Sequence, residues 1–192
     1  NLPVGFYTIA FRNQNQVFGL LVERPFQGRR DPFFGMDAAL SWLGPQTLRP
    51  SFISILHRMG VSIARERLNW GEIQPTQQTW DWETPKRYES LRGLYSSAGI
   101  PILELFNASP AWMQTGKNKS GFPENLPTTE RSWEQISHRW SRYWGGIEVW
   151  NEPDIAAGNG GPQAERYVPL VQTVKYALQS AHATTPVGGG VF

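Results

Sequence analysis

The chain has 192 residues, of which 40% are hydrophobic, and 18 Lys and Arg stand against 16 Asp and Glu, a formal charge of +2. This composition is typical of a chain that buries a core and excludes a disordered tail, and with no basic run longer than Arg29-Arg30 it argues against nucleic-acid binding. The sequence has no cysteine, which excludes disulfides, thiolate metal sites and cysteine nucleophiles, and no stretch long and apolar enough to predict a membrane span.

Two short segments rich in β-branched and aromatic residues, 4–11 and 17–22, open the chain and predict β-strands. The polar run RNQNQ between them is typical of a turn, Pro25 ends the second segment, and GRRDP predicts a linker. We therefore expect residues 1–30 to form a β-rich segment and linker. The segment is either the tail of a β-sandwich or a hairpin that decorates the next domain.

Apolar runs then alternate with segments of helical periodicity, such as Phe52, Ile55 and Met59 before the stop signal Gly60. A short strand that passes into a loop is expected at 33–40, and further strands at 61–68, 101–106, 147–150 and 186–192. Helices are expected at 50–59, 86–98, 129–143 and 164–183. This alternation predicts an α/β domain with a parallel sheet over residues 31–192. Both a doubly wound sheet and a (β/α)8 barrel begin in this way. Since no G-x-G-x-x-G follows the first strand, the nucleotide-binding version loses its main support.

The stretch IEVWNEPD, residues 147–154, ends an expected strand in a glutamate followed by a proline. Pro153 disfavours the helical region for its neighbour, so we expect Glu152 to stay extended at the strand end. In α/β folds the carboxyl ends of the strands form the active-site face. A carboxyl group at that position suits proton donation, which glycoside cleavage demands. The alternative is a capping or salt-bridged surface glutamate.

Four motifs together resemble the clan A glycoside hydrolases, which are retaining (β/α)8 barrels. WNEP resembles the acid/base motif that ends their fourth strand, and LELFNASPAWM and PVGGGVF resemble the third strand end and the fifth strand. MGVSIARERLNWGEIQPTQQTWDW resembles the second strand and its loop, particularly in the branch with β-xylosidases and α-iduronidases. The resemblance covers residues 33–192. It implies the N-terminal part of a TIM barrel, strands one to five, with no cofactor. The short β-rich segment expected from the residues at the start of the chain precedes this barrel.

The resemblance assigns the central roles. It makes Glu152 the general acid/base, Asn151 a hydrogen-bond partner of the sugar 2-hydroxyl or of the nucleophile, and Arg65 the residue that holds the nucleophile ionised. Strict alternation places Arg67 on the same face as Arg65, so either can serve, and both can instead form a structural ion pair. Alternation also sets Asn151 and Glu152 on opposite faces unless the strand end bends.

Further substrate contacts are expected at the other strand ends. Trp70 and Trp112 follow the second and third strands, where each either stacks on a sugar ring or packs in a loop. Asn107 lies at the same rim of the third strand. Asp37, just after the first strand, either binds a sugar hydroxyl or caps the next helix, and capping is the favoured alternative.

A retaining enzyme needs a second carboxylate about 5–5.5 Å from the first. In this clan it ends the seventh strand, whereas the expected strands reach only the fifth, so we expect the nucleophile outside this chain. Glu148 does not replace it, because four residues at about 3.3 Å each place it roughly 13 Å from Glu152. Glu104, inside the third strand, is no better placed.

The sequence therefore predicts a retaining glycoside hydrolase for β-linked oligo- or polysaccharides, with Glu152 as its acid/base. The rest of the barrel would come from more of the same chain or from a second polypeptide. A secreted, cell-surface or periplasmic location is expected for polysaccharide degradation. The alternative is a catalytically inactive carbohydrate-binding or structural fragment.

Overall fold

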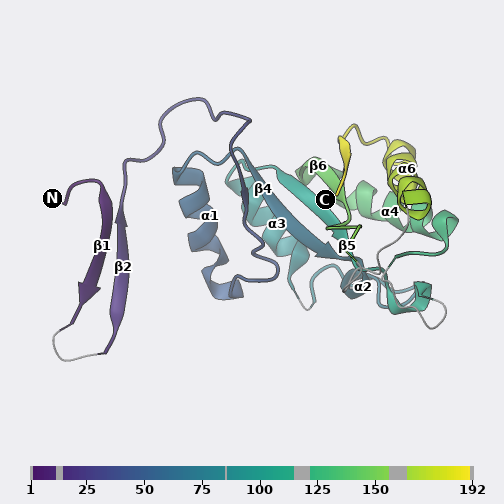
Figure 1. The fold of residues 1–192 in the computed structure, drawn as a ribbon, viewed down its shortest axis with the longest axis horizontal. Helices are drawn as coiled ribbons and strands as arrows, with labels where there is room; N and C mark the ends of the chain where they lie inside the picture. The colour runs from purple at the N-terminus through teal and green to yellow at the C-terminus, as the bar shows by residue number, and fades with distance from the viewer. Residues whose placement is uncertain (1, 12–14, 85, 115–121, 156–163, 191–192) are drawn as a thin grey trace.

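The computed structural model describes residues 2–11, 15–84, 86–114, 122–155 and 164–190 (Figure 1). A two-stranded sheet at the N-terminus precedes a five-stranded parallel sheet with its helices. The strands are β1 (Gly5–Ala10), β2 (Val17–Val22), β3 (Gly35–Asp37), β4 (Ile63–Asn69), β5 (Ile102–Asn107), β6 (Trp144–Val149) and β7 (Val187–Gly189). The α-helices are α1 (Arg49–Arg58), α2 (Trp70–Ile73), α3 (Tyr88–Ser97), α4 (Leu126–Trp140) and α6 (Ala164–Ser180), and η1 (Gln46–Leu48), η2 (Ala111–Met113) and η3 (Ser141–Tyr143) are 3-10 turns.

Strands β1 and β2 pair in antiparallel fashion, with Gly5 opposite Val22 and Ala10 opposite Val17. They form a sheet of their own that stands beside α1 at one end of the molecule (Figure 1). Several apolar side chains of this hairpin are exposed, and Phe6 keeps 71% of its surface accessible. The predicted β-rich segment is thus present, while the choice between a sandwich tail and a decorating hairpin stays a prediction.

The parallel sheet has the order β3-β4-β5-β6-β7, so every strand lies beside its neighbours in the sequence. A doubly wound sheet reverses its strand order at a switch point, where its ligand binds. This sheet has no reversal among the described strands, and it is wound in one direction, as the first five strands of a (β/α)8 barrel are. The predicted fold class is confirmed in this respect.

The helices agree with the periodicity, and their differences from it have local causes. Helix α4 begins at Leu126, three residues before the expected start, because the side chain of Asn125 accepts the backbone N–H of Thr128 and caps the first turn. The short helix α2 was not expected, and β7 is shorter than predicted; residues 191–192 of that expected strand lie outside the described residues.

The main core lies between the helices and one face of the parallel sheet. Phe106 of β5 packs against Trp133 of α4 at 4.2 Å between ring centroids and against Trp150 at 5.6 Å. All three rings are buried. Four of the nine tryptophans, Trp70, Trp133, Trp140 and Trp150, are among the largest fully buried side chains and therefore serve packing.

Two buried carboxylates also point from the sheet toward this helix layer. Glu66 accepts hydrogen bonds from the hydroxyl of Tyr95 at 2.6 Å and from the backbone N–H of Leu40 at 2.8 Å. Glu104 accepts from Arg92 and, at 2.9 Å, from the indole of Trp144. Since buried charges persist only when they are paired and hydrogen-bonded, these two glutamates are structural.

Candidate active site

The side chains of β4 separate into two sets along the strand. Ala64, Glu66 and Leu68 are buried toward the helices, whereas Arg65 and Arg67 are partly exposed on the opposite face. The alternation of a β-strand produces this division. We call the face with the two arginines the inner face, because it corresponds to the inside of a barrel whose helices lie outside.

On the inner face, Arg65 lies at the centre of a hydrogen-bonded cluster. Its Nε and Nη2 donate to the two carboxylate oxygens of Glu148 at 2.6 and 2.8 Å. Nη1 donates to Asp37 Oδ2 at 2.8 Å, and Nη2 also donates to Asn151 Oδ1 at 2.9 Å. One guanidinium therefore joins β3, β4, β6 and the segment that follows β6. The hydrogen bond to Glu148 contributes most to the raised pKa of Arg65.

Asp37 is shared between the two arginines. Arg67 donates from both terminal nitrogens to the two oxygens of Asp37, with 2.8 Å between Nη2 and Oδ2. The hydrogen bond from Arg67 is the largest influence on Asp37 and, with Arg65, holds the pKa of this carboxyl below its ordinary value. The expectation that Asp37 caps the next helix is wrong, because Pro45 and Leu48 occupy the N-cap positions of η1 and α1.

The chain bends sharply just after β6, at the candidate acid. Trp150 and Glu152 have φ angles of 69° and 45°, in the left-handed region. The expectation of an extended Glu152 is therefore wrong, although Pro153 does exclude the right-handed helical region, as predicted. The bend is what allows Asn151 to reach Arg65 while Glu152 lies exposed beside it. Strict alternation would have placed Asn151 and Glu152 on opposite faces of the sheet, and the bend removes this conflict.

A neighbouring strand and helix α6 hold the bend in place. The backbone N–H of Trp150 donates to the carbonyl of Phe106 at 2.9 Å, and the hydroxyl of Tyr167 donates to the carbonyl of Val149 at 2.7 Å. Gly190, after β7, passes so close that a Cβ atom there would collide with the carbonyl oxygen of Trp150. Gly190 therefore permits a close approach of two backbones.

The structure separates the two tryptophans for which stacking on a sugar and packing in a loop were the alternatives. Trp70 is 0% exposed and donates its indole N–H to Gln74 at 2.6 Å. A ring without an accessible face cannot stack on a sugar, so the substrate-binding assignment of Trp70 is wrong and the packing alternative holds. Trp112 is partly exposed, its indole N–H donates to the carbonyl of Gln74 at 2.9 Å, and its role stays a prediction.

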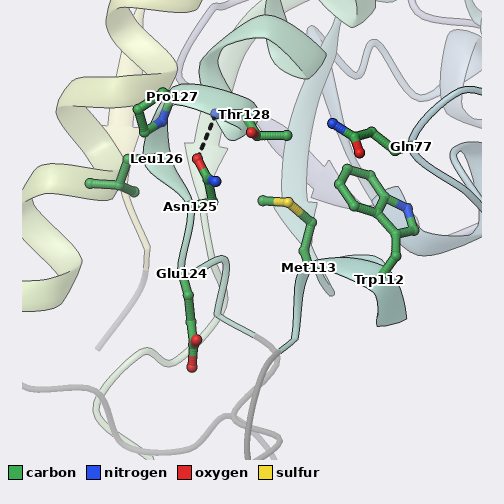
Figure 2. Close-up of a pocket in the computed structure, with 8 residues that line it drawn as sticks. All are labelled: Gln77, Trp112, Met113, Glu124, Asn125, Leu126, Pro127 and Thr128. Atoms are coloured by element: carbon green, nitrogen blue, oxygen red, sulfur yellow. Dashed lines mark hydrogen bonds between the residues drawn. The ribbon is translucent and has the colours of Figure 1, made fainter.

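Trp112 borders a cavity of about 620 Å³ near the ends of β4 and β5. Figure 2 shows Trp112 and Gln77 on one side of it and Asn125 and Thr128 on the other. Its lining residues are Gln77, Trp112, Met113, Glu124, Asn125, Leu126, Pro127 and Thr128. An aromatic face with several amide and hydroxyl groups is a combination that suits a polar organic ligand.

The other sequence-predicted residue on the rim, Asn107, ends β5. It pairs in register with Asn69, the last residue of β4, and both side chains are partly exposed. Sequence reasoning considered neither Asn69 nor any role for Glu148 other than nucleophile. The sequence signal for Glu148 was a charged residue in an otherwise apolar strand. This residue lies on the same face of the sheet as two arginines, two strands away.

No protein-family model matches the sequence, and no curated protein matches it either. Solved structures do. A family 39 glycoside hydrolase from the gut symbiont Bacteroides cellulosilyticus WH2 superimposes with a TM-score of 0.73 at 17% identity, over 97% of this chain and 39% of that one. A monomeric β-xylosidase from Caulobacter crescentus CB15 gives a TM-score of 0.63 at 19% identity, over 86% and 38% of the two chains.

An exo-β-1,4-mannosidase from Opitutaceae bacterium strain TAV5 gives a TM-score of 0.60 at 14% identity, over 81% of this chain and 30% of that one. The chain thus spans well under half of each of these structures. The likeness shows the fold alone: part of a TIM barrel, as in these solved glycosidases. The predicted resemblance is confirmed at that level.

Within the described residues, no three His, Asp or Glu side chains gather in a way that could hold a metal ion. Over the same part of the chain, no helix has both the length and the apolar character needed to cross a membrane.

Proposed function

We propose that this chain is the N-terminal part of a retaining glycoside hydrolase that cleaves β-glycosidic bonds in an oligo- or polysaccharide. The observation that carries the proposal is Glu152, exposed at the bent end of β6 directly after Asn151, which is hydrogen-bonded to Arg65. A carboxyl group on this rim can approach the oxygen of a bound glycoside. Solved glycosidases have the same fold.

In the proposed mechanism Glu152 protonates the glycosidic oxygen as the bond breaks. It then removes a proton from the water that hydrolyses the glycosyl-enzyme intermediate. The nucleophile of this double displacement comes from outside the described residues. Among the described residues, Arg65 donates four of its five N–H groups, to Glu148, Asp37 and Asn151. Its proposed influence on the nucleophile is through the fifth N–H and its charge.

Asn151 supports the substrate in this mechanism. An arginine has only donors, so the atom of Asn151 that meets Arg65 must be the amide oxygen. The amide NH2 then points elsewhere and suits donation to the sugar 2-hydroxyl. Trp112 with its cavity, Asn107 and Asp37 are proposed as further sugar contacts along the same rim.

The proposal extends to the whole molecule. Residues 1–30 form an accessory β-rich segment, residues 31–192 form the first half of the barrel, and the remaining strands come from further polypeptide. β3 and β7 are the edges of the described sheet, to which such strands would add. A secreted, cell-surface or periplasmic location suits a polysaccharide substrate.

The test is Glu152→Gln in the complete barrel, assayed on aryl β-glycosides. Turnover of substrates with poor leaving groups should fall by about 10²–10⁴-fold, the usual share of general acid–base catalysis. Dinitrophenyl glycosides need little protonation, so they should still form the glycosyl-enzyme intermediate, and added azide should rescue its breakdown as a β-glycosyl azide. The control is Glu165→Gln, an exposed glutamate of α6, which should retain full activity. Unchanged turnover in Glu152→Gln would disprove the assignment.

A further inference from the structure

We propose that Glu148 is a positioning residue of this site: it fixes Arg65, and through Arg65 it orients the carboxamide of Asn151 beside the acid Glu152. The inference rests on the proposed function and deepens it. It assigns a role to a buried carboxylate that the proposed mechanism leaves without one.

The geometry of the Glu148–Arg65 pair restricts the orientation of the Arg65 guanidinium. Glu148 is only 5% exposed, and both its oxygens accept from Arg65, at 2.6 and 2.8 Å. Two parallel hydrogen bonds between a carboxylate and a guanidinium fix the plane as well as the distance. The pair also spans β5, because Arg65 of β4 lies opposite Leu103 on one side of that strand and Glu148 of β6 lies opposite Leu105 on the other.

The same nitrogen transmits this constraint to Asn151. Nη2 of Arg65 donates to Glu148 Oε1 at 2.8 Å and to Asn151 Oδ1 at 2.9 Å. Any rotation of the guanidinium away from Glu148 therefore moves or breaks the contact with Asn151. Asn151 lies inside the bent segment, between the left-handed Trp150 and Glu152. Its hydrogen bond to Arg65 therefore attaches this segment to the cluster around Arg65.

Asp37 cannot take over this role. It binds the other terminal nitrogen of Arg65, and its side chain is 46% exposed, so it restrains the guanidinium from one side only. A purely stabilising role for Glu148 is also a weak explanation, since a buried ion pair contributes little net stability compared with apolar residues of the same volume. Orientation of Asn151 through Arg65 explains the Glu148–Arg65 pair better.

The chain offers a matched control in Glu104. It is a fully buried glutamate of the adjacent strand, also paired with an arginine, Arg92, but it faces the helices. Glu104→Gln and Glu148→Gln thus each remove one charge from one buried ion pair. Of the two glutamates, only Glu148 lies on the inner face with Asn151.

The experiment measures kcat and KM for the complete barrel and both variants, on an aryl β-glycoside and on its 2-deoxy counterpart. We expect Glu148→Gln to lose about 10²-fold in kcat on the first substrate, as misplaced groups commonly do, and much less on the second, which lacks the hydroxyl that Asn151 would hold. Glu104→Gln should lower the melting temperature and keep its kcat per folded molecule. Glu148→Asp should recover part of the lost kcat because it restores the charge.

Equal kcat losses in Glu148→Gln and Glu104→Gln, or equal losses of Glu148→Gln on the two substrates, would overturn the proposal. Failure of the parent protein to turn over any glycoside would refute the proposed function instead. The positioning role is then decided by a crystal structure of Glu148→Gln. A displaced or rotated Asn151 supports it, and an Asn151 still within hydrogen-bonding distance of Arg65 Nη2 overturns it.

Discussion

Single residues on the inner face take their properties from the partners that the fold brings to them. Asp37 is the clearest case, because two arginines from the neighbouring strand share its carboxylate. The side chain is nearly half exposed, so solvent screens these interactions. Their effect should nevertheless be measurable as a dependence of stability on pH.

We expect Asp37→Asn to lower the free energy of unfolding at neutral pH and to lose this effect in acid. The folded-state pKa of Asp37 lies below the ordinary value of 3.8, so the stability it contributes is present above pH 3.8 and is lost as the pH falls through the folded pKa. Urea unfolding of the parent and the variant, from neutral pH to below 3.8, measures the difference. Asp154→Asn, an exposed aspartate, controls for loss of charge. A difference that grows toward acid pH would contradict the prediction.

The candidate acid and its neighbour were identifiable at this scale, but the tryptophans were not. W-N-E-P after an apolar run predicts an acid near a strand end, and Glu152 does lie in the segment that directly follows β6. Trp70 shows the limit of such reasoning. It follows a strand end as a sugar platform would, yet it is buried among residues from β5 and its loop, including Phe106 and Trp112.

At the scale of elements, caps and bends place the functional segments. Helix α4 starts at Leu126 because Asn125 caps it, and Asn125 also borders the cavity beside Trp112. A hydrophobic pattern shows where a helix is periodic but does not fix its first turn, which depends on a single side-chain hydrogen bond. For this reason the predicted start was three residues late.

We expect Asn125→Ala to destabilise the protein by about 1 kcal/mol, because the N–H of Thr128 loses its acceptor. Asn125→Asp keeps an oxygen at the same position and should retain most of the stability. Urea denaturation of the three proteins at neutral pH provides the measurement. Equal losses in both variants would show that the cap is not the cause.

At the scale of the whole molecule, buried polar pairs hold the helix layer against the sheet. Arg92 of α3 binds Glu104 of β5, donates to the carbonyl of Tyr88 at 2.9 Å and stacks over Trp140 of α4, 3.8 Å from the ring centroid. Burial raises the pKa of Glu104, and the positive charge of Arg92 opposes this shift. The pair thus joins three elements.

We expect Arg92→Leu to cost about 3–5 kcal/mol, since it leaves Glu104 buried without its counter-charge. The loss should grow as the pH rises above the ordinary value of 4.5 for a glutamate, because a raised folded-state pKa penalises the ionised form. The double variant Arg92→Leu/Glu104→Leu should regain a large part of the loss. Urea unfolding of the four proteins in the cycle isolates the pair energy, and a double variant as unstable as the sum of the two single ones would refute the coupling.

The sequence by itself determined the features that depend on local chemistry. Hydrophobic periodicity established the alternation of strands and helices, and the proline after Glu152 marked the strand end that carries the candidate acid. These signals are contained within a few consecutive residues, so they can be identified without knowledge of the fold.

Only the tertiary structure decided the features that join distant residues. It distinguished a barrel from a doubly wound sheet through the order β3-β4-β5-β6-β7, and it placed Trp70 in the core. It also brought Arg65 to Glu148, 83 residues further along the chain. The physical reason is that periodicity tells which face of a strand is buried, whereas strand order and the pairing of charges across β5 depend on how all the strands pack together.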